Sequence, residues 1–235
     1  MGGDLQQPVP VPIVFVDEHL VVVDKPPGIP SVPARTPLDP PSVTVRMAAD
    51  LGWVEAVHRL DRDTSGLLVL ARTPAARAAL GHAFESRAVR KRYLAVVAGE
   101  PPGAEGLVHL PLADDPWRPP RKRVDPILGR RATTRWRRLA GAAFAGRPVS
   151  LLELEPVTGR SHQLRAHLAW LGAPIVGDRL YGGGQAVTAA GRLALHAFAI
   201  DLPHPADGRR IELVAVVRLQ GPTDPWTAFQ SLPDR

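Results

Sequence analysis

Short stretches of apolar and β-branched residues recur along the chain, several of them alternating with polar positions. The first, Ile13 to Val23, reads IVFVDEHLVVV and has two such runs around a polar link, which predicts a hairpin. Later strand-like runs are Leu67 to Ala71, Tyr93 to Ala98, Leu107 to Leu112, Ala132 to Leu139, Val149 to Val157, Leu193 to Leu202 and Arg210 to Val217. Because few helices separate them, we expect an α+β fold with a mainly antiparallel, mixed sheet and flanking helices.

Three segments have the pattern of helices. A serine caps the first, Ser42 to Leu51, and a second begins at Thr73 or Pro74 and runs to about Arg87. The third, Ser161 to Leu171, has leucines on one face at spacings of four and three and ends before a glycine. We expect one domain spanning residues 11–220, with a flexible N-terminus over 1–10 and an expendable C-terminal tail over 221–235.

Composition excludes several classes of site. The chain has no cysteine, so disulfides, thiolate zinc sites, iron–sulfur clusters and cysteine nucleophiles are excluded. No apolar stretch approaches the roughly 18 residues of a membrane helix, and the N-terminus lacks an export signal, so we expect a soluble, cytoplasmic protein. The net charge is +6, with lysine at only three positions. Arginine suits a polyanionic partner, but biased codon usage gives the same composition, so composition alone decides nothing.

A first polar loop, Val57 to Gly66, reads VHRLDRDTSG and precedes an apolar strand. Such loops on rigid elements often carry sites, although a charged surface turn is the better explanation of this one when it is taken alone. The paired carboxylates Asp61 and Asp63 suggest a glycosidase. Residues two apart on one loop cannot readily straddle a sugar, however, so we infer that only one of them acts chemically.

A second polar segment, Val157 to Leu168, leads into the third predicted helix. Ser161 can cap that helix, whose start attracts phosphate, and Arg160 adds a guanidinium there. Arg165 lies about 60° around the helix from Leu168 and should point partly inward, although a packed stem with a solvated head is an equally good interpretation. His162 and His167 are five residues apart and make a poor metal pair, so we expect no metal site.

A third segment, Trp117 to Arg138, has nine positive residues and one acidic residue, Asp125. A net charge of +8 over 22 residues would repel itself without an anionic partner, and nucleic acid is the simplest such partner. Nothing in the chain resembles the aromatic pattern of RNA-stacking modules, so a general single-strand platform is not expected.

Three separated blocks together resemble the RluA-type pseudouridine synthases: HRLDRDTSG (His58 to Gly66), KRYLAVVAG (Lys91 to Gly99) and TGRSHQLRAHL (Thr158 to Leu168). Further agreement comes from IVFVDEHLVVVDKPPGIP, PIVGDRLYGG (Pro174 to Gly183) and RLALHAFAIDLPHP (Arg192 to Pro205). The likeness spans about Ile13 to Val217. Ser161 stands where the family usually has threonine, which keeps the hydroxyl.

The resemblance implies a pseudouridine synthase fold with a central active-site cleft, and isomerisation of uridine to pseudouridine in structured ribosomal or transfer RNA, without cofactor or metal. By match to the family, Asp61 is the catalytic carboxylate and Asp63 is a bystander. An enclosed carboxylate tends to take up a proton, and the match gives Arg165 the role of pairing with Asp61 to keep it ionised. Tyr93 matches the pocket tyrosine, whose ring packs on uracil and whose hydroxyl is a candidate general base.

The resemblance also implies that the target uridine leaves its stack. His58 and Arg59 would then fill the space left by the base, Arg160, Ser161 and His162 would bind phosphates, and Leu195 would form a wall of the pocket. We expect a monomer. The main alternative is a catalytically inactive RNA-binding protein of the same fold, and a hydrolase that releases the base is a second.

Overall fold

The computed structural model describes residues 9–33, 40–183 and 189–230. The strands are β1 (Ile13–Val16), β2 (Leu20–Lys25), β3 (Glu55–Ala56), β4 (Ser65–Ala71), β5 (Arg90–Ala98), β6 (Glu105–His109), β7 (Leu112–Asp114), β8 (Lys122–Val124), β9 (Thr133–Phe144), β10 (Arg147–Pro156), β11 (Leu195–Pro203) and β12 (Arg210–Val214). The helices are α1 (Val43–Leu51), α2 (Pro74–Glu85), α3 (Gln163–Trp170) and a 3₁₀ turn, η1 (Pro225–Phe229). No helix among the described residues is long and apolar enough to cross a membrane.

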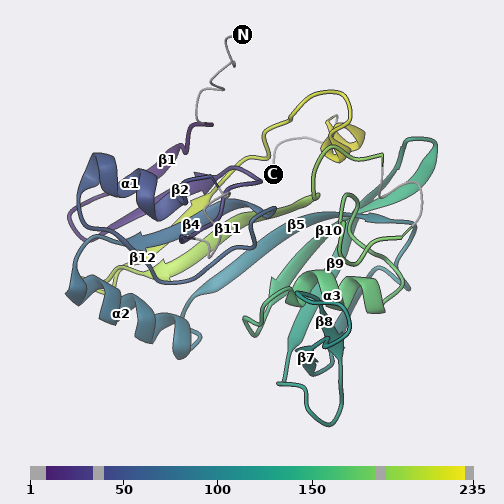
Figure 1. Ribbon diagram of the computed structural model, residues 1–235, viewed down its shortest axis with the longest axis horizontal. Coiled ribbons are helices and arrows are strands. Elements are labelled where there is room, and N and C mark those ends of the chain that lie inside the picture. Colours follow the sequence, from purple (N-terminus) through teal and green to yellow (C-terminus); the bar gives the residue numbers. More distant parts are fainter. Residues whose placement is uncertain (1–8, 34–39, 184–188, 231–235) are drawn as a thin grey trace.

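Ten strands form one sheet in the order β1-β2-β4-β11-β5-β10-β9-β6, with β12 paired to β11 and β3 paired to β4 (Figure 1). Neighbouring strands are antiparallel except β4 and β11, which run parallel. The predicted α+β class and mainly antiparallel sheet are therefore confirmed. A separate two-stranded hairpin, β7–β8, lies beside α3.

One half of the sheet is covered on both faces. In β2, Leu20 and Val22 pack toward α2, whereas Val21 and Val23 pack toward α1. Every residue of β2 and of β4 is buried, which explains why these strands read as continuous apolar runs. In the other half, α3 packs against β9 and β10. The two halves meet at β11 and β5.

The predicted hairpin and three helices are present, with two corrections. The run Leu107 to Leu112 is divided between β6 and β7, because Pro111 has no N–H to continue the ladder. The third helix begins at Gln163 rather than Ser161, and its N-cap is His162, which has a left-handed backbone (φ 55°) and makes no side-chain capping bond. Ser161 therefore does not cap α3.

The expectation of an expendable tail after residue 220 is also wrong for the part that the structure describes. Trp226 and Phe229 of η1 are buried in the core beside β9. Asp224 anchors this turn by an ion pair with Arg192, at 2.9 Å between Nη2 and Oδ2. The segment is too short and too rich in proline to show a helical period in the sequence. Residues 1–8 and 231–235 lie outside the described residues.

Candidate active site

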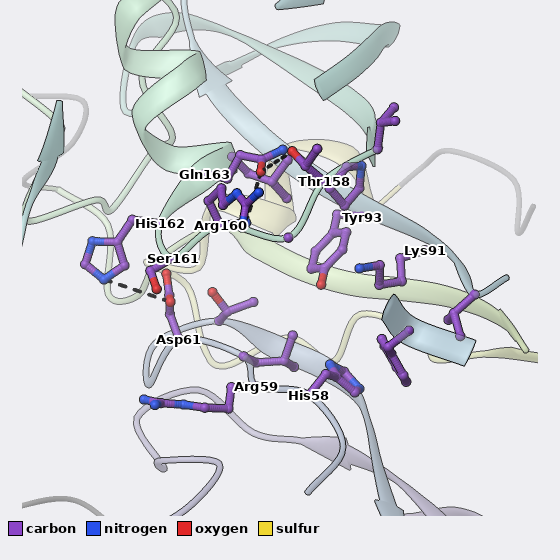
Figure 2. Close-up of a pocket in the computed structure, with 18 of the residues that line it drawn as sticks. His58, Arg59, Asp61, Lys91, Tyr93, Thr158, Arg160, Ser161, His162 and Gln163 are labelled. Atoms are coloured by element: carbon purple, nitrogen blue, oxygen red, sulfur yellow. Dashed lines mark hydrogen bonds and ion pairs between the residues drawn. The ribbon is translucent and has the colours of Figure 1, made fainter. Parts of the chain in front are cut away.

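A cavity of about 740 Å³ opens where the two halves of the sheet meet. It is lined by the loop between β3 and β4, the end of α2, strand β5 and the loop that leads into α3 (Figure 2). All nine predicted site residues line it: His58, Arg59, Asp61, Tyr93, Arg160, Ser161, His162, Arg165 and Leu195. Asp63 is exposed and does not line the cavity, which supports the choice of Asp61 over Asp63.

The expected ion pair between Asp61 and Arg165 is present. Nη1 of Arg165 lies 3.2 Å from Oδ2 of Asp61. The arginine side chain is 5 % exposed and the carboxylate is 25 % exposed, so the acid faces the cavity while its partner lies behind it. The interpretation of Arg165 as a surface arginine with a solvated head is therefore wrong.

A second carboxylate, Asp178, holds the other edge of the same guanidinium. Nε and Nη2 of Arg165 each lie 2.8 Å from an oxygen of Asp178, and this carboxylate is completely buried. Its Oδ1 also accepts from the backbone N–H groups of Leu180 and Tyr181. Although burial disfavours the charged form, the two carboxylates raise the pKa of Arg165 above its ordinary value. A two-pronged pair of this kind fixes the orientation of the guanidinium, and with it the aim of Arg165 at Asp61.

Buried groups also tie down both chain neighbours of Asp61. Lys25 is fully buried, and its ammonium donates to the carbonyl of Arg62 at 2.8 Å. Burial lowers the pKa of Lys25 to about 7. On the other side, the hydroxyl of Ser31 donates to the carbonyl of Leu60 and accepts from its N–H. Asp61 is thus presented on a loop whose backbone is held on both sides.

The loop ends at Gly66, which has φ 106°. A β-carbon built there would lie 2.3 Å from the carbonyl oxygen of Ala197 on the parallel neighbour β11. Only glycine fits both the backbone conformation and the close approach of the two strands. This explains the glycine at the end of the HRLDRDTSG block.

Tyr93 projects from β5 into the cavity (Figure 2). Burial and the negative charge of Asp61 raise the pKa of its hydroxyl above the ordinary value, so the phenol is neutral at pH 7. A neutral hydroxyl can take up a proton from substrate only while it gives up its own. The candidate general base is therefore better described as a proton relay.

His58 is a fixed part of the wall. Its Nε2 accepts from the backbone N–H of Val69 at 3.1 Å, and its ring stacks on Phe84 at 4.7 Å between centroids. Burial and the nearby Lys91 lower the pKa of His58 to about 3. These contacts oppose the expectation that His58 moves into the space left by a flipped base. The exposed Arg59 retains that expected role.

His162 points toward Asp61 rather than outward. Its Nδ1 lies 3.0 Å from the hydroxyl of Tyr181, and its Nε2 lies 3.9 Å from Oδ1 of Asp61 (Figure 2). Burial lowers the pKa of His162 despite the neighbouring carboxylate, so the ring is neutral at pH 7. A neutral ring turned inward does not suit the expected phosphate contact, which we retain for the exposed Arg160 and Ser161.

Gln163, which sequence reasoning missed, fixes the loop that carries Arg160. Its amide nitrogen donates to Thr133 and Thr134 of β9, and its oxygen accepts from the Thr158 hydroxyl and the Arg160 N–H. All its hydrogen-bonding capacity is used, so the amide has a structural role. No group of three or more His, Cys, Asp and Glu side chains that could hold a metal is found among the described residues.

Lys91, the first residue of the KRYLAVVAG block, was not singled out from the sequence. It reaches into the cavity two residues before Tyr93 on β5, with its ammonium 5.6 Å from the centroid of the Phe84 ring (Figure 2). Burial lowers its pKa. The cavity lining therefore includes a buried ammonium as well as arginines.

The basic segment Trp117 to Arg138 is not a single nucleic-acid surface. Five of its nine cations have carboxylate partners in the fold: Lys122 with Asp114, Arg123 with Asp125, Arg135 with Glu155, Arg137 with Glu153 and Arg138 with Glu100. Two of these pairs join residues directly opposite each other on β9 and β10. The net charge of +8 therefore overstates the self-repulsion of the segment, because counting charges along the chain misses cross-strand partners.

Comparison with known proteins shows the family to which this chain belongs. The family model described as RNA pseudouridylate synthase matches residues 19–170. The protein named dual-specificity RNA pseudouridine synthase RluA of Salmonella typhimurium is 43 % identical over 196 residues, which cover 83 % of this chain and 88 % of that protein. The protein of the same name from Escherichia coli K12 is 42 % identical over 203 residues, covering 86 % and 91 %.

Two solved structures share the fold. The structure called Human RNA Pseudouridylate Synthase Domain Containing 1 has a TM-score of 0.76 and 28 % identity, and the match covers 88 % of this chain and 84 % of that one. The human Domain Containing 4 structure has a TM-score of 0.69 and 24 % identity, with 88 % of each chain covered, and shows the fold alone. From the family match and the close relatives, the chain belongs to the RNA pseudouridylate synthase family and is an RluA-type isomerase that converts uridine in RNA to pseudouridine.

Proposed function

We propose that the cavity receives a flipped-out uridine of ribosomal or transfer RNA, with Asp61 as the nucleophile. The observation that carries this proposal is the buried Asp61–Arg165–Asp178 cluster at the cavity wall, which aims one partly exposed carboxylate at the substrate. Asp61 bonds to the ribose anomeric carbon as the bond to uracil N1 breaks, and the electron pair leaves with uracil. The base turns, carbon 5 displaces Asp61, the proton of carbon 5 is lost, and N1 takes up a proton, which gives neutral pseudouridine.

Arg165 and Tyr93 serve that sequence in different ways. Arg165 pairs with the Asp61 carboxylate before it attacks, and pairs with it again when the carboxylate is displaced from the ribose. The ring of Tyr93 packs on uracil while the base turns, and its hydroxyl relays the proton of carbon 5 to water. Leu195, which is buried in the cavity wall, provides apolar contact for the base.

Exposed cations at the cavity rim offset the cost of extracting the base. Unstacking a nucleotide costs a few kcal/mol, least for bases that are already unpaired. Arg59 at the rim occupies the space that the uridine leaves, and Arg160 with Ser161 binds the adjacent phosphates. Arg160 suits this role because its Nε donates to the carbonyl of Arg131, which holds the guanidinium in place.

The proposal also covers the substrate range and the oligomeric state. The relatives named dual-specificity enzymes support a range of more than one RNA, and we propose that both ribosomal and transfer RNA are modified. We further propose a cytoplasmic monomer whose catalytic domain runs from about residue 11 to 230 rather than 220, because η1 belongs to the core. Size-exclusion chromatography with light scattering tests the monomer.

The reaction is tested with RNA that carries tritium at carbon 5 of uridine. A synthase releases tritium to water while the base stays attached as pseudouridine. A hydrolase releases the whole base, and an inactive RNA-binding protein releases nothing. Release of free uracil, or no release from ribosomal and transfer RNA transcripts that the protein binds, would contradict the proposal.

A further inference from the structure

The β7–β8 hairpin, residues 112–124, presents a preorganised aromatic surface at its tip. Trp117 is 77 % exposed. The guanidinium of Arg123 lies 4.8 Å from its ring centroid and is itself held by Asp125 at 2.8 Å. One face of the indole is therefore backed by a fixed cation, and the high exposure leaves the other face open. A base can stack on that open face without ordering the site first.

The turn that carries Trp117 is held by its own hydrogen bonds. The N–H of Trp117 donates to the Asp115 carboxylate, and the N–H of Asp115 donates to the carbonyl of Arg121. The N–H of Arg121 in turn donates to the carbonyl of Arg118. These hydrogen bonds fix the conformation of the hairpin tip.

The hairpin is joined directly to the wall of the catalytic cavity. The backbone N–H of Lys122 donates to the hydroxyl of Tyr181 at 2.6 Å, and that hydroxyl contacts Nδ1 of His162 at 3.0 Å. His162 faces Asp61. The hairpin also lies beside α3, which carries Arg165 (Figure 1). An RNA whose uridine enters the cavity past His162 therefore passes the hairpin.

Arg121 of the hairpin packs on Tyr181, the residue that links the hairpin to His162. Its guanidinium lies 5.1 Å from the Tyr181 ring centroid, and its Nε is buried without a hydrogen-bond partner in the described part of the chain. Among the described residues neither Arg121 nor Arg118 has a carboxylate within ion-pair distance. These two arginines differ from those of β9, whose charges are paired inside the fold. A phosphate bound to the accessible part of these guanidinium groups would satisfy their unpaired charge.

We propose that the hairpin binds an unpaired nucleotide of the RNA next to the target uridine, with its base stacked on Trp117 and its phosphate on Arg121. The proposal rests on the proposed function, since it places this subsite beside the uridine pocket. Unpaired bases are recognised by stacking on aromatic rings and guanidinium planes, and both are present here. A protein partner fits less well, because the hairpin has four cations (Arg118, Arg121, Lys122 and Arg123) against two acids (Asp114 and Asp115). This is a single stacking position and not a general platform for single strands.

The test measures affinity for a stem-loop RNA that contains the target uridine, in an Asp61→Asn background so that the RNA is not converted. Trp117→Ala should weaken binding about 5- to 100-fold, and Trp117→Phe should lose much less because a ring remains. Trp53→Ala is the matched control, because Trp53 is also exposed, at 47 %, and lies outside the hairpin and the cavity lining. It should bind RNA as tightly as the parent.

Salt dependence tests the phosphate contact of Arg121, and single abasic nucleotides test the stacking on Trp117. Arg121→Gln should make the slope of log affinity against log salt shallower by about 0.7, whereas Arg209→Gln, at an exposed site on the β11–β12 loop, should leave it unchanged. An RNA with one abasic nucleotide beside the uridine should bind the parent protein as weakly as intact RNA binds Trp117→Ala. Trp117→Ala should not weaken binding of that abasic RNA further. In otherwise wild-type enzyme, Trp117→Ala should lower kcat/KM and leave kcat at saturating RNA intact.

The subsite is overturned if Trp117→Ala, with an unchanged melting temperature, binds the stem-loop as tightly as Trp53→Ala. It is equally overturned if Trp117→Phe is as weak as Trp117→Ala, or if no abasic position removes the difference. Failure of the proposed function would look different. The wild-type enzyme would then release no tritium, while the affinity comparison would still report on the hairpin.

Discussion

Replacing Arg165 with methionine separates the catalytic from the structural role of the buried charge cluster. Methionine keeps the apolar stem but leaves Asp178 completely buried, with only the backbone N–H groups of Leu180 and Tyr181 as donors. Removing one partner of a buried ion pair costs about 3 to 5 kcal/mol. For a chain of this size that corresponds to a fall in melting temperature of roughly 6 to 20 °C.

A second substitution distinguishes the two roles. Asp178→Asn in the same chain removes the uncompensated charge and retains an oxygen for the two backbone donors. Arg165→Met/Asp178→Asn should therefore recover most of the lost stability, measured by urea unfolding. Its tritium release should stay at least about 100-fold below wild type, because Asp61 still lacks the group that aims it. The reasoning is refuted if Arg165→Met costs less than about 1 kcal/mol, if the double variant is no more stable than the single one, or if either keeps the wild-type kcat.

Four further changes test other parts of the account. Tyr93→Phe should lower kcat about 100-fold with little change in KM if the hydroxyl relays a proton, and a loss below tenfold in steady-state assays would leave only the packing role. Gly66→Ala should lower the melting temperature and the rate together, because its methyl group would meet the backbone of β11; calorimetry that shows no change would contradict this. Trp226→Ala should cost about 3 to 5 kcal/mol in urea unfolding, whereas an expendable tail predicts no change. Burial lowers the pKa of His196 to about 4, so only the unfolded chain takes up a proton there between pH 6.5 and 4. His196 should therefore contribute about 3 kcal/mol to the loss of stability as the pH drops through that window, and His196→Gln should make the unfolding profile shallower by that amount; equal slopes for the two proteins would exclude this role.

Local signals predicted the Asp61–Arg165 pair only in part. Helix geometry placed Arg165 near the apolar stripe but left it equally able to face solvent, and the polar loop offered Asp61 and Asp63 together. The choice of Asp61 and its pairing with Arg165 came from the family resemblance. Asp178 was missed although it lies in a block quoted for the resemblance. An aspartate in a loop after glycine is ordinarily exposed, and only the tertiary fold shows that it closes on an arginine 13 residues earlier. A buried acid cannot be recognised before its cation is placed.

Strand identity was likewise easier to predict than strand partnership. The continuous apolar runs of β2 and β4 mark buried strands, but no local feature shows that β4 lies parallel to β11. Strand pairing also decides which charges form ion pairs, since only the register of β9 and β10 places Arg137 opposite Glu153. The inward turn of His162 depends in the same way on one left-handed residue at the start of α3, which no residue preference indicated.

Single-turnover tritium release by Asp61→Asn and by Asp63→Asn, each at saturating RNA, tests the central assignment most directly. Both variants change one acid of the same loop by the same chemistry, but only Asp61 lines the cavity and contacts Arg165. The account predicts background release for Asp61→Asn with RNA affinity retained, and release close to wild type for Asp63→Asn. Turnover by Asp61→Asn, or its loss in Asp63→Asn alone, would contradict it.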